Sequence, residues 1–269
     1  MSHRRKRIGA VSYLNTKPLV AGLEAISDRY ELVFDLPSRL ADRLASGELD
    51  VALIPSVEAT LNPNYRIVSD ACIGCRGPVW SVKLVSKVPA GEIKTLALDE
   101  GSRTSRALTK VILAHKFNCR PELSNLSMQS DWRESSTDAV LIIGDRAMNL
   151  DASHFVHQWD LGEVWNQWTG LPFVFAMWVA REEDELDFLA GLLSQARDRG
   201  TSQLDQLVDA NYGKYNLTRE QCDDYLKNRL HFSLGVDEKK ALKLFFEYAS
   251  QLSLIPENTE LEFHDCQTA

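Results

Sequence analysis

The sequence lacks any apolar run long enough to cross a membrane. Its longest apolar stretch, Leu171 to Ala180, is about half of the roughly 20 residues that a membrane-spanning helix requires. The basic segment Met1 to Arg7 is not followed by the apolar region of a signal peptide, because Ser12, Asn15 and Lys17 interrupt what comes next. We therefore expect no membrane association and a cytoplasmic location, and we interpret Leu171 to Ala180 as a buried strand.

An excess of positive charge is also missing. The chain carries 30 Lys and Arg against 38 Asp and Glu, a formal net charge of −8, whereas a nucleic-acid-binding surface normally shows clustered basic residues on a basic domain. We therefore expect no nucleic-acid partner. A small anionic ligand remains compatible with this balance, because helix N-termini and hydroxyl groups are sufficient to bind one.

Cysteines are few, and motifs for metals or nucleotides are missing. Five cysteines, an odd number in a chain without an export signal, are typical of free thiols in a reducing compartment. Cys72 and Cys75 form a single CxxC pair without the second pair of a structural zinc site, and we interpret the pair as a turn. His154 and His157 lack the glutamate of an HExxH motif, and no glycine-rich phosphate loop occurs. The sequence predicts no metal and no cofactor.

What the sequence does contain is an alternation of strand and helix patterns. Its 269 residues, 44% of them hydrophobic and 25% charged, are enough for two lobes with proper cores. Periodicity predicts strands over Arg7–Val11, Leu49–Ile54, Val79–Ser86, Thr95–Leu98, Ala139–Ile143 and Pro172–Ala180. Helices are expected over Lys17–Ala25, from an N-cap at Ser38 to a stop at Gly47, over Ser105–Phe117, and through most of the chain after Glu182.

The break in this pattern at Val88–Gly91 predicts the first crossing between two lobes. We predict an α/β fold whose discontinuous first lobe comprises residues 1–88 and 174–269, with a helical C-terminal part. Residues 89–173 form the inserted second lobe, and the two crossings fall near residues 87–92 and 170–174. Such an architecture closes like a clamshell on a small molecule.

Polar residues that directly follow strands are the candidate site, because ligands of open parallel sheets bind beyond the carboxyl ends of the strands. Ser12 and Asn15 follow the first strand, and Ser56 follows the buried strand that ends at Ile54. Asn15 is the strongest candidate for catalysis, since its amide can donate to and accept from a substrate at once. The structural alternative is that Asn15 or Thr16 caps a helix.

Two further groups follow strands in the second half of the pattern. Ser102, Thr104 and Ser105 lie at the start of a predicted helix, where their hydroxyls can hold a carboxylate or simply cap the helix. Gly144 and Asp145 end the strand Ala139–Ile143, and Asp145 is interpreted either as a cap or as a positioned acid.

Five strings, in order along the chain, resemble a known family. They are Ser12–Leu19, Asp50–Ser56, Gly77–Val82, Leu141–Asp145 and Trp168–Ala176. The chain is similar in these strings, over residues 8 to about 180, to the chorismate dehydratases of the futalosine route to menaquinone. The resemblance implies a fold like that of type II periplasmic-binding proteins, with two inter-lobe crossings. It also adds Ser81 to the candidate site.

The resemblance implies an activity: dehydration of chorismate to 3-[(1-carboxyvinyl)oxy]benzoate, a cofactor-independent carbon–oxygen lyase reaction with chorismate as the small-molecule substrate. The expected catalytic residues are Asn15 and Asp145, and the expected substrate-binding residues are Ser12, Ser56, Ser81, Ser102, Thr104, Ser105 and Gly144. The base stays open between a protein residue and the enolpyruvyl carboxylate of the substrate. Two alternatives are a non-catalytic small-carboxylate binding protein of the same fold and the sibling enzyme 1,4-dihydroxy-6-naphthoate synthase. The oligomeric state is left open.

Overall fold

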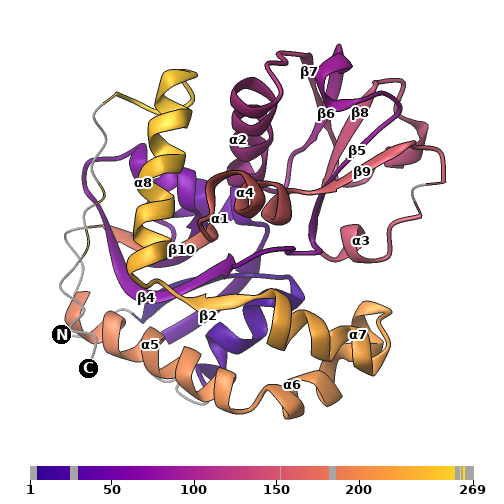
Figure 1. The fold of residues 1–269 in the computed structure, drawn as a ribbon. Coiled ribbons are helices and arrows are strands. Elements are labelled where there is room, and N and C mark those ends of the chain that lie inside the picture. Colours follow the sequence, from indigo (N-terminus) through magenta and orange to yellow (C-terminus); the bar gives the residue numbers. More distant parts are fainter. Residues whose placement is uncertain are drawn as a thin grey trace.

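A computed structural model of the chain describes residues 5–24, 30–151, 153–181 and 186–257, together with residues 261 and 263. The strands of one sheet are β1 (Lys6–Val11), β2 (Tyr30–Asp35), β3 (Val51–Pro55), β4 (Tyr65–Cys75), β10 (Phe173–Arg181) and β11 (His231–Ser233). Those of the other are β5 (Val82–Ser86), β6 (Thr95–Asp99), β7 (Glu122–Leu126), β8 (Ala139–Ile143) and β9 (His157–Asp160). The two sheets form separate lobes (Figure 1), so the predicted two-lobed α/β fold is confirmed.

The order of the strands mixes parallel and antiparallel pairs in both sheets. The six-stranded sheet runs β11-β4-β10-β3-β1-β2, and the five-stranded sheet runs β7-β6-β8-β5-β9. β1 is parallel to β2 and β3, while β10 is antiparallel to β3 and β4. In the other sheet β6 is parallel to β7 and β8, while β5 is antiparallel to β8. Loops that follow β1, β3, β6 and β8 therefore carry the candidate residues.

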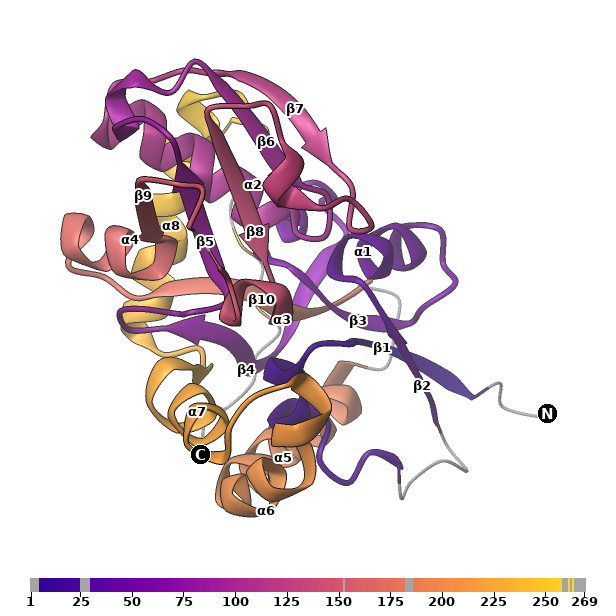
Figure 2. The same ribbon diagram turned by 90° about the vertical axis from the view of Figure 1, so that its right-hand side faces the viewer.

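Helices cover the sheets. They are α1 (Pro37–Ala45), α2 (Arg103–Val111), α3 (Asp145–Met148), α4 (Leu161–Thr169), α5 (Leu186–Ser202), α6 (Leu204–Asn211), α7 (Arg219–Asp224) and α8 (Val236–Gln251). Shorter 3₁₀ helices are η1 (Leu14–Val20), η3 (Ser56–Thr60), η4 (Ala90–Glu92), η6 (Trp132–Glu134) and η7 (Tyr212–Tyr215), and π-helical turns are η5 (Ile112–Lys116) and η8 (Tyr225–Arg229). α5 packs on β4 and η1, as expected for a helix returning to the first lobe, whereas α8 touches both β10 and α2. Figure 2 shows the five-stranded sheet above the six-stranded sheet.

An aromatic cluster holds the second crossing between the lobes in place. Trp165 of α4 is fully buried, and its ring meets those of Phe173 and Phe245 edge-on, with centroids 5.3 and 6.1 Å apart. These three residues come from α4, β10 and α8, so one cluster joins both lobes. Large aromatic side chains bury the most apolar surface per residue, which makes this crossing a rigid part of the core.

The first crossing lies earlier than the sequence predicted. β5 belongs to the five-stranded sheet, so the chain changes sheet over residues 76–81 and not at 87–92. Gly77 (φ 150°) and Trp80 (φ 66°) both have positive φ angles there, and they turn the backbone out of the first sheet. The second change of sheet falls between Thr169, where α4 ends, and Phe173, where β10 begins, in the predicted interval.

Two predicted helix starts are wrong. The helix expected over Lys17–Ala25 is the earlier 3₁₀ helix η1, with Pro18 inside it, and Ala25 lies outside the described residues. Ser38 is not a cap, because α1 begins at Pro37, whose fixed φ angle and missing N–H suit the first helical position. Gly47, at φ 80°, follows the end of α1 as expected.

The CxxC pair is not a turn either, because Cys72 and Cys75 lie within β4. Both thiols are buried, and burial raises the pKa of each, that of Cys75 to about 12. Such thiols are protonated at neutral pH and are poor nucleophiles. Cys119 and Cys222 are also free and buried, whereas Cys266 lies outside the described residues.

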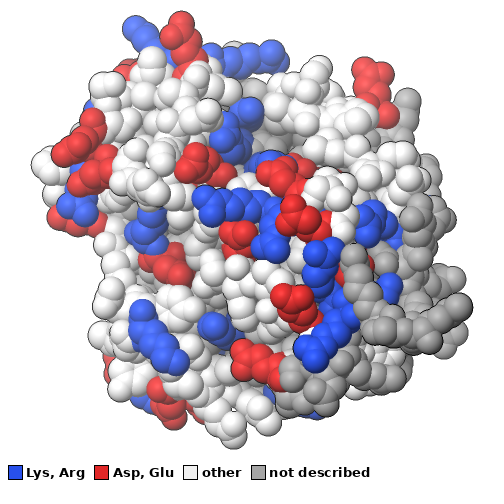
Figure 3. Space-filling view, turned by 180° about the vertical axis from the view of Figure 1, so that it is seen from behind, with Lys and Arg blue, Asp and Glu red and all other residues white. Residues whose placement is uncertain are grey.

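The charged side chains of the described residues are interspersed on the face of the molecule seen in Figure 3, where acidic and basic groups alternate. That face therefore lacks the extended patch of positive charge that nucleic-acid binding requires. No described helix combines the length and apolar character that a membrane span demands.

Candidate functional site

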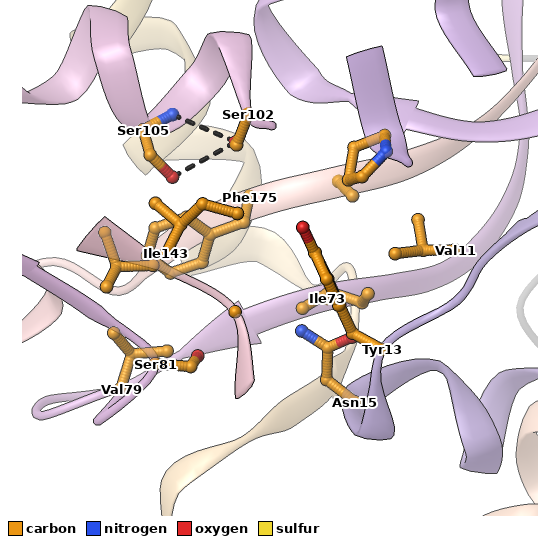
Figure 4. A pocket seen from close by; sticks show the side chains of 14 residues that line it. Val11, Tyr13, Asn15, Ile73, Val79, Ser81, Ser102, Ser105, Ile143 and Phe175 are labelled. Carbon is orange, nitrogen blue, oxygen red and sulfur yellow. Dashed lines mark hydrogen bonds between the residues drawn. The ribbon is translucent and has the colours of Figure 1, made fainter. Parts of the chain in front are cut away.

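A cavity lies between the two lobes and is lined by residues of both (Figure 4). It contains about 470 Å³ of empty space, part of it open to solvent. The described residues that line it are Val11, Tyr13, Asn15, Pro37, Ile73, Val79, Ser81, Val82, Ser102, Ser105, Ile143, Gly144, Phe175 and Ala176. None of these residues carries a formal charge. The site therefore presents neutral hydrogen-bonding groups on an apolar background.

Asn15 reaches the cavity from η1 and is not a helix cap. Tyr13 occupies the N-cap position of η1, and its side chain makes no capping hydrogen bond. The Asn15 carbonyl oxygen accepts a hydrogen bond from Thr16 Oγ1 at 3.4 Å, so the amide nitrogen faces the other way. The capping alternative for Asn15 and Thr16 is thus contradicted, and Asn15 is a polar group of the cavity.

Tyr13 projects into the middle of the cavity, as Figure 4 shows. Its hydroxyl is buried and has no hydrogen-bond partner among the described residues. Burial is the main reason that the pKa of Tyr13 is raised, and the charges of Asp99 and Asp145 raise it further. The phenol therefore stays protonated and can donate to a bound anion. Sequence reasoning missed Tyr13, although it stands inside the string Ser12–Leu19.

Ser102 and Ser105 face the cavity from the start of α2. Ser102 is the N-cap, and its Oγ accepts hydrogen bonds from Ser105 N at 3.3 Å and from Ser105 Oγ at 3.1 Å. Because Ser102 Oγ accepts twice, its own proton is available to another acceptor. The two predictions for this segment are therefore compatible: the same hydroxyls cap the helix and line the cavity beside the positive end of its dipole.

Ser81 lines the cavity from the first crossing. It is 2% exposed, and its Oγ accepts a hydrogen bond from Tyr225 Oη at 2.9 Å. The backbone before it is held by Asp160, the N-cap of α4, whose carboxylate accepts from Val79 N at 2.9 Å and from Trp80 N at 2.5 Å. Sequence reasoning missed Tyr225 and Asp160, because neither stands in a recognisable motif.

Ser56 and Thr104 meet across the lobes, outside the cavity lining. Their hydroxyl oxygens are 3.3 Å apart; Ser56 Oγ donates to Val174 O at 2.7 Å, and Thr104 Oγ1 accepts from Val57 N at 3.2 Å. The structure therefore places both in an interlobe contact. Ser12 is exposed at the end of β1 and does not line the cavity.

Gly144 lines the cavity, whereas Asp145 is not among the lining residues. Gly144 has φ 72° and ψ −157°, and an added Cβ would come within 3.0 Å of the Tyr13 ring. Asp145 is the first residue of α3 and makes no capping bond; it accepts from Leu14 N of the other lobe at 3.4 Å. Burial raises the pKa of Asp145 to about 6, against the lowering effects of the Leu14 N–H and Lys17.

A buried carboxylate supports the loops of the second lobe. Asp99 is fully buried and accepts from Gly101 N at 2.9 Å and from Ile143 N at 3.2 Å, and it forms an ion pair with Arg146. Burial raises the pKa of Asp99, while Arg146 lowers it. The carboxylate therefore fixes the loop before α2 to the end of β8. Among the described residues, no group of three or more His, Cys, Asp or Glu is arranged to hold a metal ion.

Solved structures place this architecture in a known class. A protein of Archaeoglobus fulgidus is similar with a TM-score of 0.75 at 18% identity, over 95% of this chain and 100% of that one. A Candida albicans protein described as having the generic periplasmic binding protein fold gives 0.64 at 15% identity, over 97% and 98%. The alkanesulfonate-binding protein of Xanthomonas axonopodis pv. citri, bound to MOPS, gives 0.68 at 15% identity, over 95% of each chain. The fold and the interlobe cavity thus define a two-lobed protein with a fold like that of the periplasmic binding proteins.

The sequence narrows this class to one family. The chain belongs to the menaquinone biosynthesis family, whose model matches residues 6–251. It is 27% identical over 264 residues to the chorismate dehydratase of Thermus thermophilus, covering 89% of this chain and 93% of that one. It is 28% identical over 246 residues to the chorismate dehydratase of Campylobacter jejuni, covering 90% and 92%.

Proposed function

We propose that the chain is a chorismate dehydratase that converts chorismate to 3-[(1-carboxyvinyl)oxy]benzoate and water. The observation that carries the proposal is the interlobe cavity, in which uncharged hydrogen-bond donors from both lobes stand among apolar lining residues. Relatives named chorismate dehydratase, similar over about nine-tenths of the chain, support the choice of substrate.

The reaction needs positioning more than it needs a strong acid or base. The C3 proton of chorismate is acidified by conjugation to the ring carboxylate, and loss of this proton with the C4 hydroxyl makes the ring aromatic. The protein has to hold two carboxylates and orient the ring in a site from which water is excluded. Ser102 and Ser105 at the start of α2 are suited to one carboxylate, and Tyr13, Asn15 and Ser81 offer donors on the other side.

The uncharged lining supports a base that belongs to the substrate. Because no described lining residue is charged, we assign proton abstraction at C3 to the enolpyruvyl carboxylate of the substrate itself. The carboxylate takes the C3 proton, the C4–O bond breaks, and the resulting carboxylic acid returns that proton to the departing C4 oxygen, which leaves as water. Asn15 then acts as an orienting group, and Asp145, next to Gly144 in the chain, remains a catalytic candidate. Cofactor independence and a cytoplasmic location are part of the same proposal.

Product analysis tests this proposal directly. Purified protein incubated with chorismate and excess chelator should yield the aromatic enol ether, identified by mass and ultraviolet spectrum. Chorismate that binds and is recovered unchanged would instead identify a non-catalytic binding protein. Turnover of the substrate of 1,4-dihydroxy-6-naphthoate synthase, but not of chorismate, would identify the sibling enzyme. Activity lost with chelator and restored by a divalent ion would contradict cofactor independence.

A further inference from the structure

Tyr225 is a buried polar residue that joins two candidate residues of the cavity. It is 1% exposed and begins η8, the π-helical turn that follows α7. π-Helical turns are rare and are frequent at functional sites. The phenol oxygen is hydrogen-bonded to the side chains of both Ser81 and Asn15. Three segments that are far apart in the sequence therefore meet at one oxygen atom.

The directions of these hydrogen bonds are set by proton counting. The phenol has one proton, which it donates to Ser81 Oγ at 2.9 Å. Its oxygen can then only accept from Asn15, so the amide nitrogen of Asn15 is the donor, consistent with the Asn15 carbonyl oxygen facing Thr16. Ser81 Oγ, which accepts the phenol proton, directs its own proton elsewhere, and Ser81 lines the cavity.

We propose that Tyr225 is a positioning residue of the site: its phenol fixes Ser81 as a hydrogen-bond donor toward the substrate. The inference rests on the proposed function. A serine hydroxyl rotates freely and can donate or accept, and a site that stabilises an anion requires a donor already aimed at it. Because Ser81 Oγ already accepts the phenol proton of Tyr225, its own proton is aimed at the substrate site before the substrate arrives.

Packing around Tyr225 leaves the phenol little freedom to turn away. The Trp80 ring lies edge-on to the Tyr225 ring, with centroids 5.9 Å apart. Trp80 itself is fixed by its backbone N–H, which donates to Asp160. Burial is the main reason that the pKa of Tyr225 is raised, so the phenol keeps the proton that the arrangement requires.

The Tyr225→Phe variant removes the hydroxyl and keeps the ring. We expect kcat for chorismate to fall about tenfold or more, the scale of one lost hydrogen bond to a charged group, with KM changed much less. Tyr65→Phe is the matched control, because Tyr65 is also buried and the variant loses a hydrogen bond to Asn62. Tyr65 begins β4, whereas Ser81 follows the opposite end of that strand, at Cys75. The Tyr65→Phe variant should retain the turnover of the natural chain.

A double variant separates positioning from stability. If Tyr225 acts through Ser81, adding Tyr225→Phe to Ser81→Ala should reduce kcat little further, because the hydroxyl that Tyr225 orients is already gone. Losses that multiply, or a Tyr225→Phe enzyme within about twofold of the natural kcat, would overturn the inference. A natural chain that leaves chorismate unchanged would instead overturn the proposed function, and the inference with it.

Neutron diffraction from the natural chain in D₂O gives a test that depends neither on variants nor on turnover. We expect the Tyr225 deuteron between Tyr225 Oη and Ser81 Oγ, and the Ser81 deuteron directed into the cavity. A Ser81 deuteron directed at Tyr225 would refute the inference even for a chain that turns over chorismate. This measurement also decides the question if Tyr225→Phe does not fold.

Discussion

Asn15 owes its position to a tight 3₁₀ helix that begins directly after the first strand. Because it caps nothing, its removal deletes a cavity group without exposing a helix end. We expect Asn15→Ala to lose turnover of chorismate on the order of 100-fold, the scale of one positioned donor in a water-poor site. Asn15→Asp, which removes the donor and places a carboxylate beside an anion, should lose at least as much.

A matched variant controls for the loss of an asparagine. Asn62 accepts a hydrogen bond from Asn64 N in an exposed turn, so Asn62→Ala removes a structural amide far from the cavity. Melting temperature and kcat are measured for both variants. An Asn15→Ala protein that melts several degrees lower yet keeps near-natural turnover per folded molecule would make Asn15 structural, and the catalytic assignment would move to Asp145 and Ser81.

Asp145 should make stability fall as pH rises. Its pKa is raised from 3.8 to about 6 in the folded chain, so ionisation is unfavourable there by about 3 kcal/mol. A raised acid pKa contributes no penalty below about pH 4 and its full penalty above about pH 6. We expect Asp145→Asn, which cannot ionise, to gain about 1–3 kcal/mol of stability over the natural chain between pH 4 and pH 7.5.

Denaturant unfolding of both proteins at each pH measures this difference. Asp151→Asn serves as a control of opposite sign, since hydrogen bonds from Ser153 lower the pKa of the exposed Asp151. A stability difference for Asp145→Asn that does not vary with pH would show that its carboxyl is not desolvated. Turnover of the same variant tests the catalytic assignment: unchanged turnover would restrict Asp145 to its contact with Leu14.

At the residue scale the sequence predicted much of the cavity lining. Asn15, Ser102, Ser105 and Gly144 line it, because each follows the end of a strand, and Ser81, which the family resemblance added, lines it as well. Tyr13 and Tyr225 were missed for different reasons. Tyr13 could have been found, since it stands two residues before Asn15. Tyr225 could not, because only the packing of a C-terminal helix brings it to Ser81.

At the scale of the element, strands were predicted better than connections. β8 has the predicted bounds, because an apolar run ending at glycine marks a buried strand. The lobe to which β5 belongs depends on which strands it pairs with. The sequence pattern within β5 does not show that pairing. The Arg76–Gly77–Pro78 segment was the available signal for the first crossing, since glycine at φ 150° permits the turn.

The start of α2 shows one element serving two roles. Its N-cap hydroxyl faces the cavity, while the next hydroxyl, that of Thr104, is used against Ser56 and Val57 of the other lobe. The sequence pattern placed three hydroxyls together but could not assign them to different partners. Only the relative position of the lobes separates a lining residue from an interlobe contact.

At the scale of the whole molecule, the lobes are held together by contacts that flank the cavity. Leu14 N donates to Asp145, Arg103 pairs with Glu58 at 3.0 Å and with Asp42 at 2.7 Å, and the Tyr13 ring packs on Gly144. In a clamshell, such contacts should determine how much of the population is closed on the substrate.

Gly144→Ala tests the Tyr13 contact across the cleft. The φ and ψ of Gly144 are costly for alanine, and the new Cβ would press on the Tyr13 ring at 3.0 Å, so the lobes should separate and the affinity for chorismate should fall. Small-angle X-ray scattering should report a larger radius of gyration, and titration a higher Kd. Gly170→Ala is the control, because Gly170 also has positive φ but its Cβ would meet nothing within 4 Å. If both variants lose the same stability and both keep the natural radius and affinity, the contact between Tyr13 and Gly144 does not govern closure.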